Sequence, residues 1–242
     1  METLHLDEID STNSYAIREA YRLPDMVLIT AQKQFAGRGQ RGNSWEAEPG
    51  KNLTFSLFFR PRDFLACRQF FLSEAVALAI KDALQILGID AKVKWPNDIY
   101  VGDSKIAGLL LEHRLFGANI AHTIAGVGLN VNQRNFFSNA PNPISIWQII
   151  QRETDLSALL GSIADALERQ LNRAFDKEAS ILLHADYMKA LWRGSGIFPY
   201  RDSSTGEVFD AAIEGVEPSG RLLLRQADSL RCYAFKEVEF LI

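Results

Sequence analysis

Between residues 91 and 132, four short apolar segments follow one another with no room for a helix between them. The segments read "AKVKW", "IYV", "SKIAGLLLEHRL" and "NIAHTIAGVGLNVN", and the turn-forming sequences "PND", "GDS" and "FGA" separate them. Parallel strands need a long crossover connection, whereas strands joined by a tight turn pair antiparallel. The stretch therefore predicts an antiparallel meander.

Helices are expected to cover this sheet. Residues 70–87 are apolar on most sides and end at Gly88, which favours a buried central helix. Residues 155–192 have helical periodicity, and a shorter helix is expected behind an N-cap within "STN". Two more strands, "MVLITAQ" and "KNLTFSLFFR", flank a glycine-rich loop. Together these elements predict an α+β fold with a mixed, largely antiparallel sheet packed with helices.

The character of the chain changes after Arg193. From there to the C-terminus, apolar stretches of strand length are divided by "SSTG" and "EPSG". This pattern predicts a small β-barrel of about five strands. We therefore expect two domains, residues 1–193 and residues 194–242.

Composition excludes several classes of protein. Hydrophobic residues make up 47% of the 242 residues and charged residues 23%, which excludes disordered and fibrous chains. No apolar run reaches about 18 residues, and the first ten residues are acidic, so we expect a cytoplasmic protein without a membrane partner. The two cysteines and four histidines have no metal-ligand spacing. A net charge of −4 argues against general binding to nucleic acid.

The loop "GRGQRGNSWE", residues 37–46, concentrates positive charge in this acidic chain. It contains three glycines together with Arg38 and Arg41, and the longer stretch 31–44 has no acidic residue. Glycines let the backbone approach a ligand, and arginines suit carboxylate or phosphate. The loop fits neither a P-loop nor a GxGxxG motif. It predicts a site for a small anion, with arginines that are unpaired when the site is empty.

One strand has a face without side chains. In "NIAHTIAGVGLNVN", alternation places Gly126, Gly128 and Asn130 on one face and apolar residues on the other. A flat ligand resting on the sheet would need such a face. Glycines that accommodate a tightly packed helix are the alternative.

Polar residues lie at the ends of the neighbouring strands. Regular alternation places Lys105 on the same face as Ala107 and Leu109, at the end of an apolar stripe. In "KWPND", Asn97 and Asp98 lie where one expected strand ends and the next begins, and such a pair can be an ordinary turn. Beside a basic loop, a carboxylate could instead hold Mg²⁺ against phosphates.

Five motifs occur in an order that resembles the biotin protein ligases: "DSTN", "QKQFAGRGQRGNSW", "VKWPNDIYV", "SKIAGLLLE" and "GVGLNVN". The C-terminal segment resembles the SH3-like β-domain of that family, so the resemblance spans nearly the whole chain. It implies a catalytic domain of the type shared with class II aminoacyl-tRNA synthetases. It also implies a biotin–[acetyl-CoA-carboxylase] ligase, which forms biotinyl-5′-AMP from biotin and ATP with Mg²⁺. Such an enzyme passes biotin to one lysine of a biotin carboxyl carrier protein or domain.

The resemblance also assigns residues to the site. It implies catalytic roles for Arg38, Lys105 and Asp98. It implies that biotin is bound by Ser11, Thr12, Asn13, Gln34, Arg38, Gly39, Gln40, Lys105 and Gly108. It implies that ATP is bound by Arg38, Arg41, Trp45, Asn97 and Asn130, and it leaves the metal ligands open.

Three details qualify this resemblance. Many relatives have a basic residue where this chain has Gln40. Bifunctional relatives carry an N-terminal DNA-binding domain before the "STN" motif, which begins here at Ser11, so we expect a monofunctional enzyme with no DNA partner. Phe136 or Phe137 either covers the adenine or belongs to a plain surface loop. Relatives occur as monomers and as dimers, and we favour a homodimer.

Two other functions stay open at this point. A lipoate or octanoyl protein ligase or transferase would share the broad fold and act on a similar carrier lysine. A non-catalytic module that binds a nucleotide or RNA would use the basic loop alone. RNA-binding Arg-Gly segments are repetitive, whereas this chain has one short Arg-Gly loop, which argues against RNA. "GRGQRG" together with "KWPND" favours biotin over lipoate.

Overall fold

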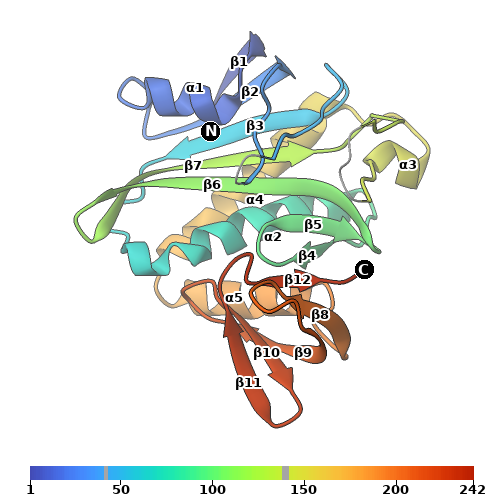
Figure 1. Cartoon of the computed structure of the whole chain (residues 1–242). Helices are drawn as coiled ribbons and strands as arrows, with labels where there is room; N and C mark the ends of the chain where they lie inside the picture. The colour runs from blue at the N-terminus through green and yellow to red at the C-terminus, as the bar shows by residue number, and fades with distance from the viewer. Residues whose placement is uncertain (41–42, 138–141) are drawn as a thin grey trace.

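The structure is a computed structural model that describes residues 1–40, 43–137 and 142–242. Its larger sheet has seven strands in the order β1-β2-β3-β7-β6-β5-β4 (Figure 1). The strands are β1 (Glu2–Ile9), β2 (Met26–Gln34), β3 (Leu53–Phe59), β4 (Lys92–Lys94), β5 (Asp98–Val101), β6 (Ser104–Phe116) and β7 (Asn119–Leu129).

The predicted meander is confirmed, because β4, β5, β6 and β7 pair antiparallel in chain order. Strands β2 and β3 extend the sheet from β7, also antiparallel. At the edge, β1 pairs parallel with β2, and helix α1 (Thr12–Glu19) makes the crossover between them. The sequence prediction missed β1, whose residues are mostly partly or fully exposed and include four acidic or histidine side chains.

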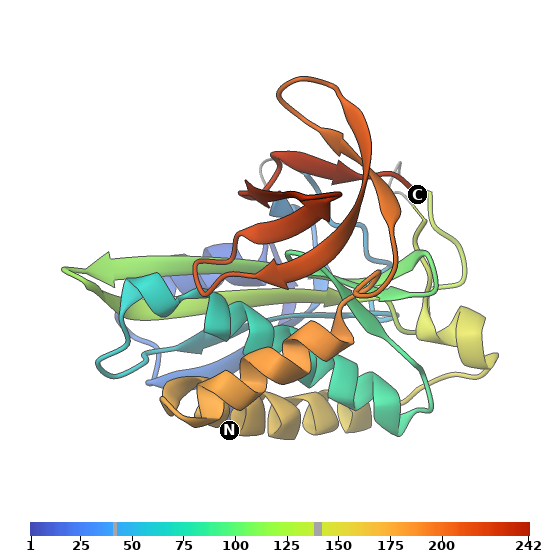
Figure 2. The same cartoon turned by 90° about the horizontal axis from the view of Figure 1, so that it is seen from below.

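Helices lie on both faces of this sheet (Figures 1 and 2). The described helices are α1, α2 (Phe70–Ile86), α3 (Ile146–Ile150), α4 (Leu156–Phe175) and α5 (Ala179–Ala190), with a 3₁₀ turn at Ala66–Arg68. The expected buried helix is α2, which is confirmed. The helical periodicity expected over residues 155–192 is confirmed, and the region contains two helices, α4 and α5. Asp176 leaves the helical conformation, and its carboxylate caps the next helix by accepting from the backbone N–H of Ala179 at 2.7 Å.

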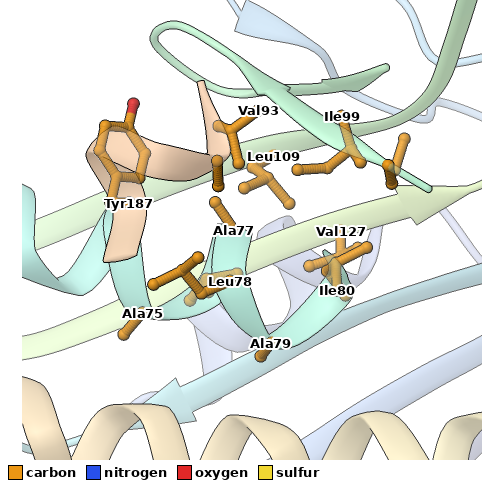
Figure 3. Packing of buried hydrophobic residues seen from close by; sticks show 14 of the residues in the cluster. Ala75, Ala77, Leu78, Ala79, Ile80, Val93, Ile99, Leu109, Val127 and Tyr187 are labelled. Atoms are coloured by element: carbon orange, nitrogen blue, oxygen red, sulfur yellow. The ribbon is translucent and has the colours of Figure 1, made fainter. Parts of the chain in front are cut away.

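Strand alternation divides the sheet's side chains between two cores. Phe55 and Leu57 of β3 pack on the side of α2, while Phe58 packs on the side of α1. In β7 the predicted apolar face is confirmed, since Val127 joins the α2 core. Figure 3 shows Leu109 beside Ala77 and Val127 beside Ile80 of α2. The opposite face of β6 and β7 is left for the loop and for α1.

The C-terminal segment forms a second sheet, antiparallel and five-stranded, in the order β11-β10-β9-β8-β12. Its strands are β8 (Phe198–Asp202), β9 (Val208–Val216), β10 (Leu222–Gln226), β11 (Ser229–Tyr233) and β12 (Val238–Phe240). The expected strand number is confirmed, and the five strands do not close into a complete barrel. Closure requires β11 and β12 to pair, and they lie at opposite ends of the order. The three-residue β12 instead packs Phe240 against Trp192, with ring centroids 6.0 Å apart.

This second sheet contacts the strand that precedes the "PND" turn. The indole of Trp95 donates a hydrogen bond to the carbonyl of Gly220 at 2.9 Å and packs on Phe235. Gly220 has a φ of +88°, and a Cβ there would lie 2.6 Å from Phe70 Cδ2 of helix α2. The turn at Gly220 is therefore packed too closely for a side chain. No helix in the described ranges is both long and apolar enough to cross a membrane.

Candidate active site

The floor of the site is a row of residues in register across four strands. Thr54 of β3 is paired with Gly128 of β7, which is paired with Gly108 of β6, which is paired with Asp98 of β5. Two residues along β7, Gly126 lies between Ser56 of β3 and Leu110 of β6. The central positions of this floor therefore carry no side chains, as alternation predicted for β7.

Both glycines of β7 are needed because other groups approach the sheet closely. A Cβ at Gly126 would lie 2.3 Å from Asn13 Oδ1, and a Cβ at Gly128 would lie 2.2 Å from Trp45 Cε2. The helix-packing reading of the glycines therefore applies to Gly126, which lies under α1. Gly128 instead lies under the indole of the loop residue.

A cavity of about 60 Å³ lies above this floor. Of the residues named from the sequence, the cavity is lined by Ser11, Thr12, Asn13, Gln34, Arg38, Gly39, Gln40, Trp45, Asn97, Lys105 and Gly108. Asp98 and Asn130 lie beside the cavity rather than on its lining, and Arg41 lies outside the described residues.

One wall of the cavity is a buried polar network at the start of α1. Ser11 caps the helix by accepting from the backbone N–H of Ser14, and the backbone N–H of Thr12 donates to Gln34 Oε1 at 2.7 Å. Ser56 Oγ lies 2.7 Å from the Thr12 hydroxyl and 2.5 Å from Asn13 Oδ1. Because the amide oxygen can only accept, the Ser56 hydroxyl donates to Asn13 and accepts from Thr12.

Sequence reasoning missed Ser56, which is fully buried. In "LTFSLFF" a polar residue alternates with apolar ones, and this pattern could have indicated a polar position facing away from the main core. The hydroxyl fixes the orientation of the Asn13 amide, whose Nδ2 then points to Leu110 O at 3.2 Å and to Glu112 Oε2 at 2.8 Å.

Lys105 lies at the opposite end of the floor. Its Nζ is 2.7 Å from Asp98 Oδ1 and 5.7 Å from the centroid of the Trp45 ring. The predicted face is wrong, because a β-bulge places Ile106 as an extra residue opposite β5 and reverses the alternation. The lysine side chain consequently lies over Gly108, with Nζ 3.2 Å from the position of its absent Cβ.

The glycine-rich loop is fastened to the sheet in this structure. Arg38 makes a bidentate contact with Glu112, at 2.9 Å to Oε1 and 3.2 Å to Oε2. A β-bridge joins Arg38 to Ser44, and the backbone N–H of Gly39 donates to Asn43 O at 2.7 Å. The expectation of an unpaired arginine is therefore wrong for Arg38, because β6 supplies a carboxylate that the local sequence does not contain.

Several polar atoms around the cavity are buried without a protein partner in the described structure. They include Trp45 Nε1, Gln40 Oε1 and Asn130 Oδ1. The Asn130 amide is held by its nitrogen, which donates to Ile144 O at 3.1 Å. Buried polar atoms are nearly always hydrogen-bonded, so such atoms around one cavity indicate that a polar ligand completes them.

The "KWPND" segment divides its side chains between two tasks. Asn97 lines the cavity and is fixed by donating to Leu109 O at 2.7 Å. Lys94 turns away, toward the rings of Tyr100 and Phe240 at 5.1 and 5.2 Å. Burial lowers the pKa of Lys94. This lysine therefore belongs to the contact with the second sheet rather than to the cavity.

The two phenylalanines proposed to cover adenine differ in burial. Phe136 is half-buried, whereas Phe137 is 87% exposed, and residues 138–141 that follow are not described. No group of three or more His, Cys, Asp or Glu residues that could hold a metal ion occurs among the described residues.

The sequence matches the family of biotin/lipoate A/B protein ligases over residues 6–130. A biotin–[acetyl-CoA-carboxylase] ligase of Paracoccus denitrificans is 32% identical over 229 residues, which cover 91% of this chain and 92% of that protein. The chain belongs to the biotin/lipoate A/B protein ligase family. Its relatives also include the bifunctional ligase/repressor BirA of Escherichia coli, 31% identical over 91% of this chain and 68% of BirA.

The fold agrees with this family membership. A biotin protein ligase from Aquifex aeolicus, solved in complex with biotin and ATP, superimposes with a TM-score of 0.81 at 21% identity. The match covers 98% of this chain and 97% of that one. Both the seven-stranded sheet and the C-terminal sheet are therefore features of the family fold.

Proposed function

We propose that this protein is a biotin protein ligase that activates biotin with ATP and transfers it to a lysine of a biotin carboxyl carrier protein or domain. The observation that carries the proposal is the glycine floor between two cations, Lys105 and Arg38. A carboxylate and the α-phosphate of ATP are both anions and must meet for the reaction. A floor without side chains gives them space, and the two cations reduce their repulsion.

The polar wall suits the rings of biotin. Ser11, Thr12, Asn13 and Gln34 offer hydroxyl and amide groups, and a cyclic urea has both N–H donors and a carbonyl acceptor. The dithiolane ring of lipoate has neither, so it would make no hydrogen bonds of this kind with the wall. The wall therefore favours biotin within a family that includes ligases for both.

In the first reaction, a carboxylate oxygen of biotin attacks the α-phosphorus of ATP and pyrophosphate leaves. In the second, the amine of the carrier lysine attacks the biotinyl carbonyl, AMP leaves, and the amine loses a proton. We assign charge stabilisation in both steps to Lys105 and Arg38, and we assign the orientation of Lys105 to Asp98. No protein nucleophile is needed, because positioning and electrostatics supply the rate enhancement.

We assign the nucleotide to the side of the floor near Trp45, Asn97 and Asn130. The partnerless Asn130 Oδ1 is an acceptor suited to an amino group such as that of adenine.

The described lining of the cavity contains no carboxylate, and Asp98 stands beside it. A Mg²⁺ ion usually binds phosphates, water and one or two carboxylates, so a single neighbouring carboxylate would suffice to hold it beside the nucleotide, where it would neutralise phosphate charge. Asp98 is the residue that we propose for it.

The cavity as it stands is small for biotin. Ligand sites typically measure about 300–1,000 Å³, and the cavity here has about 60 Å³ because the indole of Trp45 lies on Gly128 and within reach of Gly108. We infer that Trp45 moves off the floor when ligand binds. Its indole N–H, buried without a partner, then becomes available to the ligand or to solvent.

We assign residues 1–193 to catalysis and residues 194–242 to a C-terminal SH3-like domain, because β8 to β12 pair only among themselves. A homodimer, a cytoplasmic location, a monofunctional enzyme and the absence of a DNA partner stay predictions. So does the binding role of Arg41, which the structure does not describe.

The deciding experiment is ATP–pyrophosphate exchange, measured with biotin, with lipoate and with neither. We expect exchange with biotin alone, followed by transfer of biotin to a purified carrier domain. Exchange with lipoate in preference to biotin would assign the protein to the other branch of the family. No exchange with either acid would refute an activating ligase.

A further inference from the structure

Glu112, on strand β6, contacts two parts of the candidate site with one carboxylate. It receives two hydrogen bonds from the guanidinium of Arg38 and one from the amide of Asn13. We propose that Glu112 is a positioning residue, which orients Arg38 toward the cavity and links the glycine-rich loop to the polar wall. The identity of the anion that Arg38 receives rests on the proposed function, but the contacts do not.

The geometry leaves Arg38 able to bind an anion. A guanidinium has five N–H donors, and the fork that faces Glu112 uses one from each terminal nitrogen. Because Arg38 also lines the cavity, its remaining donors are available to a ligand there. The carboxylate thus holds the arginine in one orientation without using all of its donors.

The rigid end of this link is the polar wall. Asn13 is 4% exposed and Ser56 is fully buried, so the amide that donates to Glu112 Oε2 has a fixed position. The other end is less buried, since the side chain of Arg38 is 41% exposed. Ser56 therefore fixes Asn13, Asn13 helps to fix Glu112, and Glu112 in turn orients Arg38. A change in the wall is expected to loosen the loop.

Glu112 and Asp98 make equivalent contacts with the two cations of the site. Asp98 is 2.7 Å from Lys105, and Glu112 is 2.9 Å from Arg38. Each of these two cations lines the cavity and is paired with a carboxylate that does not line it. Side chains that are held in place before the ligand arrives need less ordering when it binds.

The test uses Glu112→Gln, which keeps the shape of the side chain and removes its charge. We expect trypsin to cleave the Arg38–Gly39 bond of the ligand-free variant about two- to fivefold faster, the upper part of the range for a partly exposed charged pair. The matched control is Glu214→Gln. Glu214 makes a bidentate contact with Arg225 at 2.8 and 2.9 Å in the C-terminal sheet, and its loss should leave cleavage at Arg38 unchanged.

A salt titration separates an electrostatic role from a merely structural one. In the unaltered protein, NaCl should accelerate cleavage after Arg38, because salt screens a partly exposed ion pair. In Glu112→Gln this dependence should be absent. All rates are divided by those of a peptide with the loop sequence, which corrects for the effect of salt on trypsin. Salt-independent cleavage of the unaltered protein would overturn the proposal even if the variant failed to fold.

The second readout is the retention of biotinyl-adenylate. Glu112→Gln should release the bound adenylate about two- to fivefold faster than the unaltered protein, while Glu214→Gln should release it at the same rate. Equal cleavage and equal release in Glu112→Gln and the unaltered protein would refute a positioning role. If the unaltered protein forms no adenylate, the proposed function fails, and the cleavage of the ligand-free protein still decides the role of Glu112.

Discussion

Replacing Gly126 by alanine tests the polar wall directly. The added methyl carbon would lie 2.3 Å from Asn13 Oδ1, whereas non-bonded carbon atoms are comfortable at about 3.5–4.0 Å. Asn13 therefore has to move by roughly 1 Å. That movement breaks the hydrogen bonds from its amide to Leu110 O and Glu112 Oε2, and it leaves a side chain that is 4% exposed without partners.

The magnitude follows from two contributions. A buried polar group without a partner costs about 1–3 kcal/mol, and overpacking costs a similar amount. Because one movement causes both, we expect the free energy of unfolding to fall by about 2–4 kcal/mol. The KM for biotin should rise tenfold or more, since about 1.4 kcal/mol corresponds to one decade of affinity. Urea denaturation measures the first effect and ATP–pyrophosphate exchange the second.

A matched substitution controls for adding a methyl group. Gly161→Ala lies in helix α4, exposed, and a Cβ there meets nothing within 4 Å. It should stabilise the protein by about 0.5–1 kcal/mol, because alanine favours the helix, and leave the biotin KM unchanged. If Gly126→Ala instead unfolds like the unaltered protein and binds biotin as well, the close approach of Asn13 to the floor is wrong.

Three further outcomes are expected. Lys105→Ala should lose about 1.5–3 kcal/mol of charge-assisted binding, hence ten- to more than a hundredfold in the rate of adenylate formation; an unchanged single-turnover rate would contradict its role. The hydrogen bond to Glu74 raises the pKa of His184 above 6.5, and burial raises that of Glu74 above 4.5. The folded state then holds more protons than the unfolded state, so the free energy of unfolding should fall as pH rises from about 4.5 through the pKa of folded His184. Glu74→Gln should flatten this fall in urea denaturation across that pH range, and identical profiles would exclude the pair as its cause. Trp95→Phe removes the hydrogen bond to Gly220 O and should lower the free energy of unfolding by about 1–2 kcal/mol, measured the same way; a change below about 0.3 kcal/mol would show that the bond contributes nothing.

Features that depend on neighbours in sequence were predictable. The antiparallel order of β4 to β7 follows from turns too short for a crossover, and the bare face of β7 follows from alternation. The buried helix α2 follows from an apolar surface on most sides and from Gly88 at its end. Each of these is determined by a local pattern, which the sequence displays directly.

Features that depend on contacts distant in sequence were not predictable. The bulge at Ile106 is marked by neither proline nor glycine, yet it moves Lys105 to the other face of β6. Glu112 contacts Arg38, which is 74 positions away in the sequence, and Asn13, which is 99 positions away. No local sequence pattern therefore indicates these contacts. The open edge between β11 and β12 likewise depends on how strands pack in three dimensions.

The contact between Trp95 and the turn at Gly220 bears on how this protein can mutate. Asn97 lines the cavity two positions after Trp95, and Gly220 has room for no other residue because Phe70 fills the space. A side chain at Gly220 would push the turn away and free the indole that precedes the site. A genetic screen for inactive variants should therefore find substitutions at Gly220 as well as at Lys105. A substitution at Gly220 would then have the same effect as one in the active site, although Gly220 does not line the cavity.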